Sequence, residues 1–195
     1  MNLDIKLHKE DLPDQLILSD NIAVDCEFTG LNVERDNLCL VQISTGNGDA
    51  HIVKLNRKTY DAPNLVKLLS SKSTQFIMHY ARQDLMWLKY HLKVSPHKIF
   101  CTKLASKIAR TASTNHGYKD LVKEICGKDI SKKEQQSDWG DPNLSEKQIK
   151  YAASDTEHLF EIRNKLIKKF KYLKISRTKK LRYIDNYLII RLYII

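Results

Sequence analysis

The sequence has few cysteines, and they do not form the patterns that hold small proteins together. Its 195 residues include four cysteines, Cys26, Cys39, Cys101 and Cys126, with no C-x-x-C pair and no His/Cys cluster of zinc-site spacing. A disulfide framework or a structural zinc site is therefore not expected. A chain of this length can bury roughly 70% of its unfolded surface and needs neither to fold. Scattered thiols of this kind are typical of reduced, cytosolic proteins.

Long hydrophobic runs are also missing. The N-terminal segment MNLDIKLHKEDLPD lacks the apolar core of a signal peptide. The most apolar stretch, YLIIRLYII at 187–195, is short and is interrupted by Arg191, so we do not expect it to cross a bilayer. We predict a cytoplasmic protein without a membrane partner. The apolar stretch is compatible with a partner surface or with a core helix, and the oligomeric state stays open.

The chain has no internal repeat, no low-complexity linker and no glycine-rich phosphate loop. Its length suits one domain, which we place at residues 1–175, followed by a tail at 176–195 to which the sequence assigns no role.

Charge of one sign is in excess. The formal net charge is +10, and residues 163–182 contain ten basic side chains and no acid. A basic excess suits contact with phosphates, although a surface that favours solubility has the same composition. The basic run is compatible with a solvated helix face or with a nucleic-acid contact.

The pattern of apolar residues predicts an α/β protein with a mixed sheet flanked by helices. The expected strands are 21–28, 38–44, 50–55 and 75–79. The first expected helix follows Pro63. Three more cover residues 83–92, 102–110 and 117–126, the last of these with Gly127 as its stop signal, and a final long helix begins at residue 146. Ser145 and Gln148 form a capping box before that last helix.

Two carboxylates end the first of these strands. Asp25 and Glu27 lie two residues apart, so the pleat places both side chains on one face. Such close acids repel each other unless cations neutralise them, and oxygen ligands suit Mg²⁺ and Mn²⁺. The alternative is a strand that runs out into solvent, where acids are common.

Further acids occur after a later strand and on the last helix. Asp84 opens the helix at 83–92, where it is either a helix cap or a third carboxylate at the same end of the sheet. Tyr151 and Asp155 lie four apart, which stacks them on one helix face, and two alanines between them permit close packing. An amphipathic helix with an ordinary surface acid would have the same pattern.

The order of these signals resembles one family. AVDCEFTGL at 23–31, HYARQDLMWL at 79–88 and YAASDTEHL at 151–159 are similar to the three motifs of the ribonuclease D group of the DEDD exonuclease superfamily, in its tyrosine-bearing branch. The resemblance covers roughly residues 20–165 and includes the segment that precedes the third motif. The sister branch has a histidine at the position of Lys150. One departure is Cys101-Thr102, where relatives often have Asp-Thr, and we expect it to alter packing rather than chemistry.

The resemblance implies a ribonuclease H-like fold and a 3′–5′ exonuclease. It implies that Asp25, Glu27, Asp84 and Asp155 hold two divalent cations, Mg²⁺ or Mn²⁺, and that Tyr151 orients the attacking water. The two-metal hydrolysis would release nucleoside 5′-monophosphates.

Several other residues are candidates for binding the substrate. We expect Glu27 to accept the terminal 3′ hydroxyl, and Phe28 and Leu31 to pack against the last bases. His79, Lys132, Gln135 and Trp139 are further candidates, each with a purely structural role as its alternative.

The sequence leaves three functions open. The first is an exoribonuclease acting on single-stranded RNA with a free 3′ end, which the ribonuclease D resemblance favours. The second is a DNA-directed 3′–5′ exonuclease, because the motifs contact phosphate and sugar rather than the 2′ position. The third is a non-catalytic nucleic-acid-binding module, whose usual mark is loss of a site carboxylate.

Overall fold

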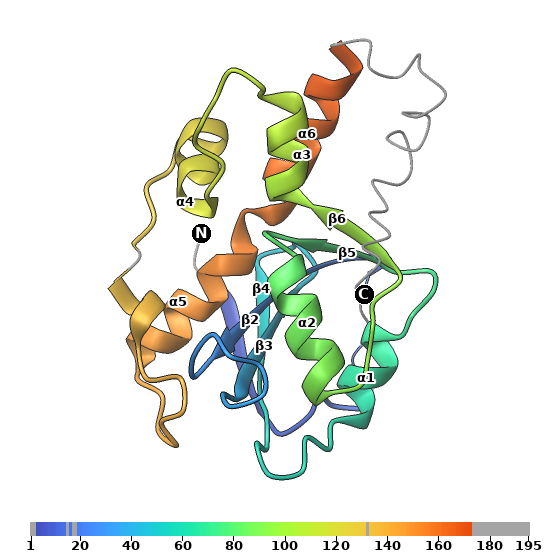
Figure 1. Cartoon of the computed structure of the whole chain (residues 1–195), viewed down its shortest axis with the longest axis vertical. Coiled ribbons are helices and arrows are strands. Elements are labelled where there is room, and N and C mark those ends of the chain that lie inside the picture. The colour runs from blue at the N-terminus through green and yellow to red at the C-terminus, as the bar shows by residue number, and fades with distance from the viewer. Residues whose placement is uncertain (1–2, 15, 17–18, 132, 173–195) are drawn as a thin grey trace.

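One mixed six-stranded sheet organises the molecule. The computed structural model describes residues 3–14, 16, 19–131 and 133–172. The strands are β1 (Asp4–Lys9), β2 (Asn21–Phe28), β3 (Leu38–Ser44), β4 (Asp49–Lys54), β5 (Gln75–Met78) and β6 (Lys98–Cys101), and they lie in the order β1-β4-β3-β2-β5-β6 (Figure 1). β3 is antiparallel to β2 and β4, whereas the other neighbouring strands are parallel. The predicted α/β fold with a mixed sheet is therefore confirmed.

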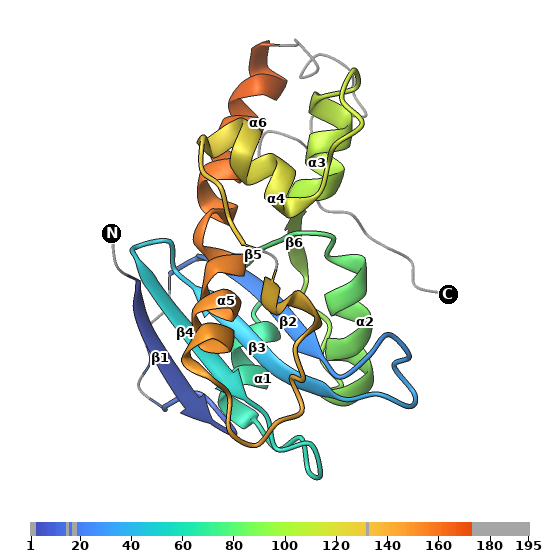
Figure 2. The ribbon, with the colours of Figure 1, turned by 90° about the vertical axis from the view of Figure 1, so that its left-hand side faces the viewer.

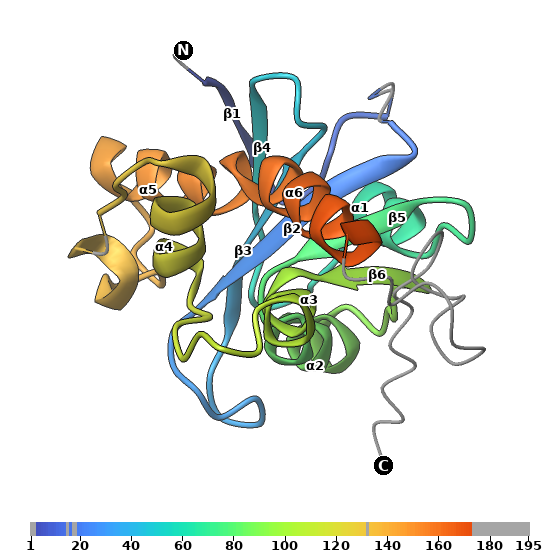
Figure 3. The ribbon, with the colours of Figure 1, turned by 90° about the horizontal axis from the view of Figure 1, so that it is seen from above.

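Helices cover both faces of this sheet. α1 (Pro63–Leu69) and α2 (Arg82–His91) pack on one face, and α5 (Glu146–Glu157) packs across β2, β3 and β4 on the other (Figure 2). α3 (Thr102–Ala109), α4 (Tyr118–Leu121) and α6 (Leu159–Tyr172) form a second helical group beside β5 and β6 (Figure 3). A short 3₁₀ helix, Lys133–Gln136, precedes α5.

The pleat of β2 decides which face receives the acids. Ile22 and Val24 belong to the apolar core under α1 and α2, whereas Ala23 belongs to the core on the opposite side. Because side chains alternate along a strand, Asp25 and Glu27 lie on the same face as Ala23. This is the face that α5 covers.

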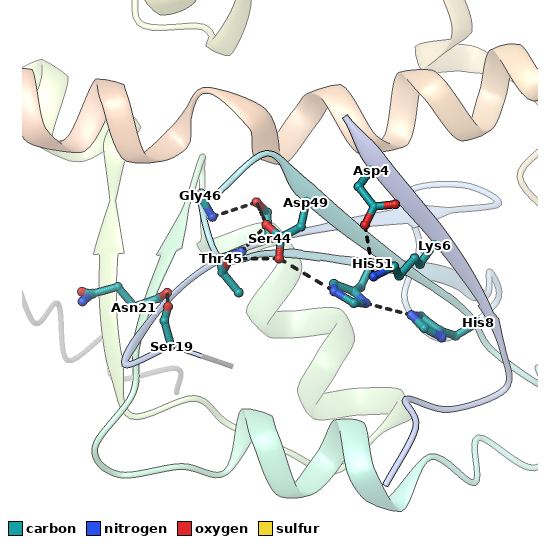
Figure 4. A network of polar contacts seen from close by, with 10 residues as sticks. All are labelled: Asp4, Lys6, His8, Ser19, Asn21, Ser44, Thr45, Gly46, Asp49 and His51. Atoms are coloured by element: carbon teal, nitrogen blue, oxygen red, sulfur yellow. Dashed lines mark hydrogen bonds and ion pairs between the residues drawn. The ribbon is translucent and has the colours of Figure 1, made fainter. Parts of the chain in front are cut away.

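A polar network joins the edge strand β1 to β4 (Figure 4). His8 Nε2 and His51 Nδ1 share a hydrogen bond of 2.9 Å, and His51 Nε2 lies 3.7 Å from Asp49 Oδ2. Asp49 also accepts hydrogen bonds from the Ser44 hydroxyl and the Thr45 backbone amide. Burial lowers the pKa of both His8 and His51, so the pair is neutral at neutral pH. These contacts fix the register of a strand that has a partner on one side.

Several expected elements are confirmed. The strands at 21–28 and 38–44 and the helix that begins at Pro63 have the expected positions, and the strands at 50–55 and 75–79 differ by one residue. The helix expected at 83–92 begins and ends one residue earlier, and the helix expected at 102–110 ends one residue earlier. The capping box is formed, since the Ser145 hydroxyl accepts from the Gln148 amide and the Gln148 side chain accepts from the Ser145 amide.

Two expected helices differ in the structure. The segment 117–126 is α-helical only at Tyr118–Leu121 and continues as a π-helical turn to Cys126, before Gly127 in the left-handed conformation (φ 69°). The long helix from 146 is interrupted at His158, which separates α5 from α6. Strands β1 and β6 were not expected, because charged residues dominate the first and only four residues form the second.

Some predictions fall on residues that the structure does not describe. These are Lys132, the apolar stretch at 187–195 and the basic run beyond residue 172. Among the described residues, no helix combines the length and the apolar composition that crossing a membrane requires.

Candidate active site

A cleft of about 700 Å³ opens where the end of β2 meets α2 and α5. Its walls include Asp25 and Glu27 from β2, Asp84 from α2, and Tyr151 and Asp155 from α5. Residues from three separated parts of the sequence therefore reach one cavity.

Local structure explains how each side chain arrives there. Asp84 is the third residue of α2 and lies in the first helical turn, where the helix dipole favours an acid, and only 4% of it is exposed. Tyr151 and Asp155 lie one turn apart on α5. Ala152 and Ala153 are fully buried against the sheet, so their small side chains let α5 approach β2 closely.

Three of the acids form a tight cluster. Asp25, Glu27 and Asp155 each place one carboxylate oxygen so that these oxygens all lie within 4.8 Å of one another. Asp84 lines the same cleft but is not a member of this three-residue cluster.

Crowding of these acids raises their pKa values. Burial is the main reason that the pKa of Asp25 lies well above its usual range, followed by the negative charges of Asp84, Asp155 and Glu27. Burial and the neighbouring acids also raise the pKa of Glu27 and of Asp84. The protein alone therefore does not neutralise the negative charge that these acids would carry when ionised.

A divalent cation would supply the missing compensation. Carboxylate oxygens are the ligands that hard cations such as Mg²⁺ and Mn²⁺ prefer, and a bound cation favours the ionised form of each acid. The donor type, the closeness of the oxygens and their raised pKa values all fit a metal site.

Tyr151 is held beside this cluster as a protonated phenol. Burial raises its pKa far above the usual range, the charges of Asp155, Glu27 and Asp25 raise it further, and a hydrogen bond links it to Asp155. At neutral pH the hydroxyl can therefore donate a hydrogen bond but cannot act as a base.

The other expected substrate residues occupy different parts of the cleft. Phe28 lies in its wall and stacks on Trp87, with ring centroids 4.4 Å apart. Leu31 is 83% exposed at the rim, and Gln135 lines the wall from the 3₁₀ helix. Trp139 is buried and packs at 5.9 Å against the Tyr151 ring, which is the geometry of a packing residue.

His79 lies at the end of β5 and has structural partners. Its Nδ1 is 2.9 Å from the Thr102 hydroxyl, and its ring centroid is 5.7 Å from that of Tyr118. The same Thr102 hydroxyl donates to the Met78 carbonyl, which ties β5 to the start of α3.

Four further residues lie in or beside this site and were not predicted from the sequence. Tyr80, Lys103 and Tyr118 line the cleft, and Gln42 lies opposite Asp25 in β3. Gln42 is fully buried and its side-chain amide has no hydrogen-bond partner within the described protein. Tyr80 could have been predicted, because it is next to His79 in the second motif. The position of the other three beside the acids depends on how distant segments of the chain pack together.

Tyr118 bonds to the backbone of α5 and to the residue that separates α5 from α6. Its hydroxyl donates a 2.8 Å hydrogen bond to the Ser154 carbonyl and accepts a 3.2 Å hydrogen bond from the His158 amide. These bonds satisfy backbone groups at the interruption between α5 and α6.

Known proteins resemble this chain over most of its length. Residues 6–171 match the family model described as 3′–5′ exonuclease. The ribonuclease D of Gluconacetobacter diazotrophicus is 34% identical over 71% of this chain, and that of Xanthomonas oryzae pv. oryzae is 32% identical over 83%. The chain covers only 35% and 44% of these two relatives.

Solved structures have the same fold over most of this chain. Brucella melitensis NrnC bound to pGG superposes with a TM-score of 0.84 at 39% identity, over 94% of this chain and 90% of that one. The NrnC structure with bound Mg²⁺ has a TM-score of 0.83 at 38% identity, over 93% and 90% of the two chains. Escherichia coli ribonuclease D, at 22% identity and a TM-score of 0.68 over 85% and 44%, shares the fold. The chain therefore belongs to the 3′–5′ exonuclease family, among its ribonuclease D-like DEDD members.

Proposed function

We propose that this protein is a metal-dependent 3′–5′ exonuclease that removes nucleotides from single-stranded RNA at a free 3′ end and releases nucleoside 5′-monophosphates. The observation that carries the proposal is the cluster of Asp25, Glu27 and Asp155, whose oxygens lie within 4.8 Å of one another in an open cleft. Residues 1–175 form the exonuclease domain in this proposal, supported by the family match over 6–171.

The acids provide the metal ligands. Asp25, Glu27 and Asp155 would hold a cation directly, and Asp84 would contribute from the same cleft. Two bound divalent ions would activate the attacking water and stabilise the departing 3′ oxygen. Both Mg²⁺ and Mn²⁺ suit these ligands, and the NrnC structure with bound Mg²⁺ favours magnesium.

The remaining groups position the substrate and the water. Tyr151, protonated because burial and the adjacent acids raise its pKa, orients the water by a hydrogen bond. Glu27, which lines the cleft, would accept the terminal 3′ hydroxyl and so give the site its preference for an end. Phe28 and Leu31 present apolar surface to the terminal base, since both line the cleft beside Glu27.

RNA is the favoured substrate. The two curated relatives named above are ribonucleases D, and the NrnC structure contains pGG. The alternative function, a non-catalytic nucleic-acid-binding module, is disfavoured because all four acids of the motifs are present and line the cleft.

The activity is tested with RNA labelled at either end, in Mg²⁺ and separately in Mn²⁺. Mononucleotides should be released from the 3′ end, and circular RNA of the same sequence should stay intact. Asp25→Asn should abolish hydrolysis, whereas the matched control Asp61→Asn, an exposed acid outside the cleft, should retain it. Cleavage of the circle, or full activity of Asp25→Asn, would contradict the proposal.

A DNA oligomer of the same sequence tests the preference for RNA. The 2′ hydroxyl is the systematic difference between the two substrates. Faster hydrolysis of DNA than of RNA would assign the enzyme to DNA ends while leaving the metal site and the direction of hydrolysis in place.

A further inference from the structure

An exposed aromatic residue on the cleft wall is held in an unfavourable backbone conformation. Tyr80 lies in the short connection between β5 and α2, and its φ is +59°. A bulky residue in this left-handed region is an outlier that costs on the order of 1 kcal/mol or more, and such strain clusters at sites that bind ligands. Tyr80 nevertheless remains 47% exposed and lines the same cleft as the acids.

A lysine from another helix lies over the Tyr80 ring. Lys103 Nζ, from α3, is 3.9 Å from the ring centroid, which is a close cation–π contact. Among the described residues that line the cleft, Lys103 is the only lysine or arginine. The cleft is also lined by four acids, Asp25, Glu27, Asp84 and Asp155, so the ammonium of Lys103 is a cationic group in an otherwise acidic cleft.

The chemistry of this pair suits one nucleotide. A tyrosine ring stacks on any base, and a lysine ammonium contacts a phosphate as a point charge. Neither residue belongs to the acid cluster, and both come from the wall that β5, α2 and α3 build. Phe28 and Leu31, which serve the terminal nucleotide in the proposed function, instead come from the last residue of β2 and the loop after it.

We propose that Tyr80 and Lys103 form a subsite for the nucleotide that precedes the terminal one, with Tyr80 stacking on its base and Lys103 contacting its phosphate. The inference rests on the proposed function for the position of the terminal nucleotide. The subsite would add binding contacts to oligonucleotides that an ester of a single nucleotide cannot make.

The structure supplies a matched control. Tyr90 is 43% exposed and has Lys93 Nζ at 5.1 Å from its ring centroid, but neither residue lines the cleft. Tyr90→Ala and Lys93→Gln therefore remove a similar aromatic and a similar charge away from the substrate.

The test variants are Tyr80→Gly and Lys103→Gln. Glycine adopts a positive φ without strain, so Tyr80→Gly removes the ring without lowering the melting temperature. RNA binding is measured by the fluorescence anisotropy of a labelled oligoribonucleotide, with Ca²⁺ in place of Mg²⁺. Tyr80→Gly should weaken binding on the order of tenfold. Lys103→Gln should reduce the slope of log K against log salt by about 0.7.

Kinetics distinguish the subsite from the metal site. In Mg²⁺ the ratio of kcat/KM for RNA to kcat/KM for the p-nitrophenyl ester of thymidine 5′-monophosphate should fall about tenfold in Tyr80→Gly. An unchanged ratio together with unchanged RNA affinity would overturn the subsite, as would equal losses in Tyr90→Ala and Lys93→Gln. A wild-type enzyme that hydrolyses neither substrate, but whose RNA binding depends on Tyr80, would refute the proposed function and leave the subsite standing.

Discussion

Replacing Asp25 should make the metal-free protein more stable while it abolishes activity. Three carboxylate oxygens, from Asp25, Glu27 and Asp155, lie within 4.8 Å of one another in the acid cluster. Two unit charges 4.8 Å apart repel by about 3.5 kcal/mol at an effective dielectric constant of 20. Because the raised pKa values let these acids keep protons, part of that repulsion is already relieved. We expect Asp25→Asn, which keeps the side-chain volume, to raise the free energy of unfolding by about 2 kcal/mol.

The stability gained by Asp25→Asn should depend on pH and should increase as the pH rises. The folded protein holds protons on Asp25, Glu27 and Asp84 that the unfolded chain releases above about pH 4, because burial and mutual repulsion raise all three pKa values. The cluster therefore costs more stability as pH rises from that value towards the folded-state pKa values. The difference between Asp25→Asn and wild type should grow from about pH 5 to pH 8.

Thermal and urea unfolding in EDTA provide the assay. A gain of about 2 kcal/mol corresponds to a rise in melting temperature of about 4–8 °C for a domain of this size. Comparing variant with wild type at each pH cancels the contribution of His8 and His51, which titrate in both proteins. Adding Mg²⁺ should stabilise the wild type and not the variant, which reverses their order.

Two results would refute this reasoning. One is a melting temperature of Asp25→Asn in EDTA equal to or below that of the wild type across the pH range. The other is a rise of similar size in Asp61→Asn, because that exposed acid is not part of the cluster.

Three further predictions concern the site and its support. Tyr151→Phe should lower kcat about 100-fold while the Mg²⁺-dependent rise in melting temperature persists; an unchanged kcat would remove the tyrosine from the mechanism. Tyr118→Phe removes a hydroxyl that bonds to the backbone of α5 at Ser154 and to the amide of His158 between α5 and α6, so urea unfolding should show a loss of about 1–3 kcal/mol, and no loss would mean that water replaces it. Gly46→Ala should destabilise by more than 2 kcal/mol by urea unfolding, since φ is +82° and the new Cβ would lie 2.8 Å from the Phe160 ring. Gly48→Ala, with φ +83° and no atom within 4 Å of the new Cβ, should cost only about 1–2 kcal/mol, and equal losses would show that the contact with Phe160 contributes nothing.

Prediction from the sequence succeeded where the signal is local. The strand at 21–28 has a continuous apolar run, and its period of two places Asp25 and Glu27 on one face. The spacing of Tyr151 and Asp155 requires only that residues 146–157 be helical. Prediction failed at His158, where the helix is interrupted and the backbone amide donates to the hydroxyl of Tyr118, 40 positions away, a contact that no local pattern indicates.

The sequence by itself determined the class of fold and the family and predicted the groups proposed to carry the chemistry, because motifs, alternation along strands and spacing along helices are properties of short segments. Only the tertiary structure decided which of these groups meet. It brings Asp155 to Asp25 and Glu27, keeps Asp84 on the same cleft but outside that cluster, and places Lys103 over Tyr80. These long-range contacts depend on strand pairing and helix packing between distant segments, and no local pattern in the chain specifies them.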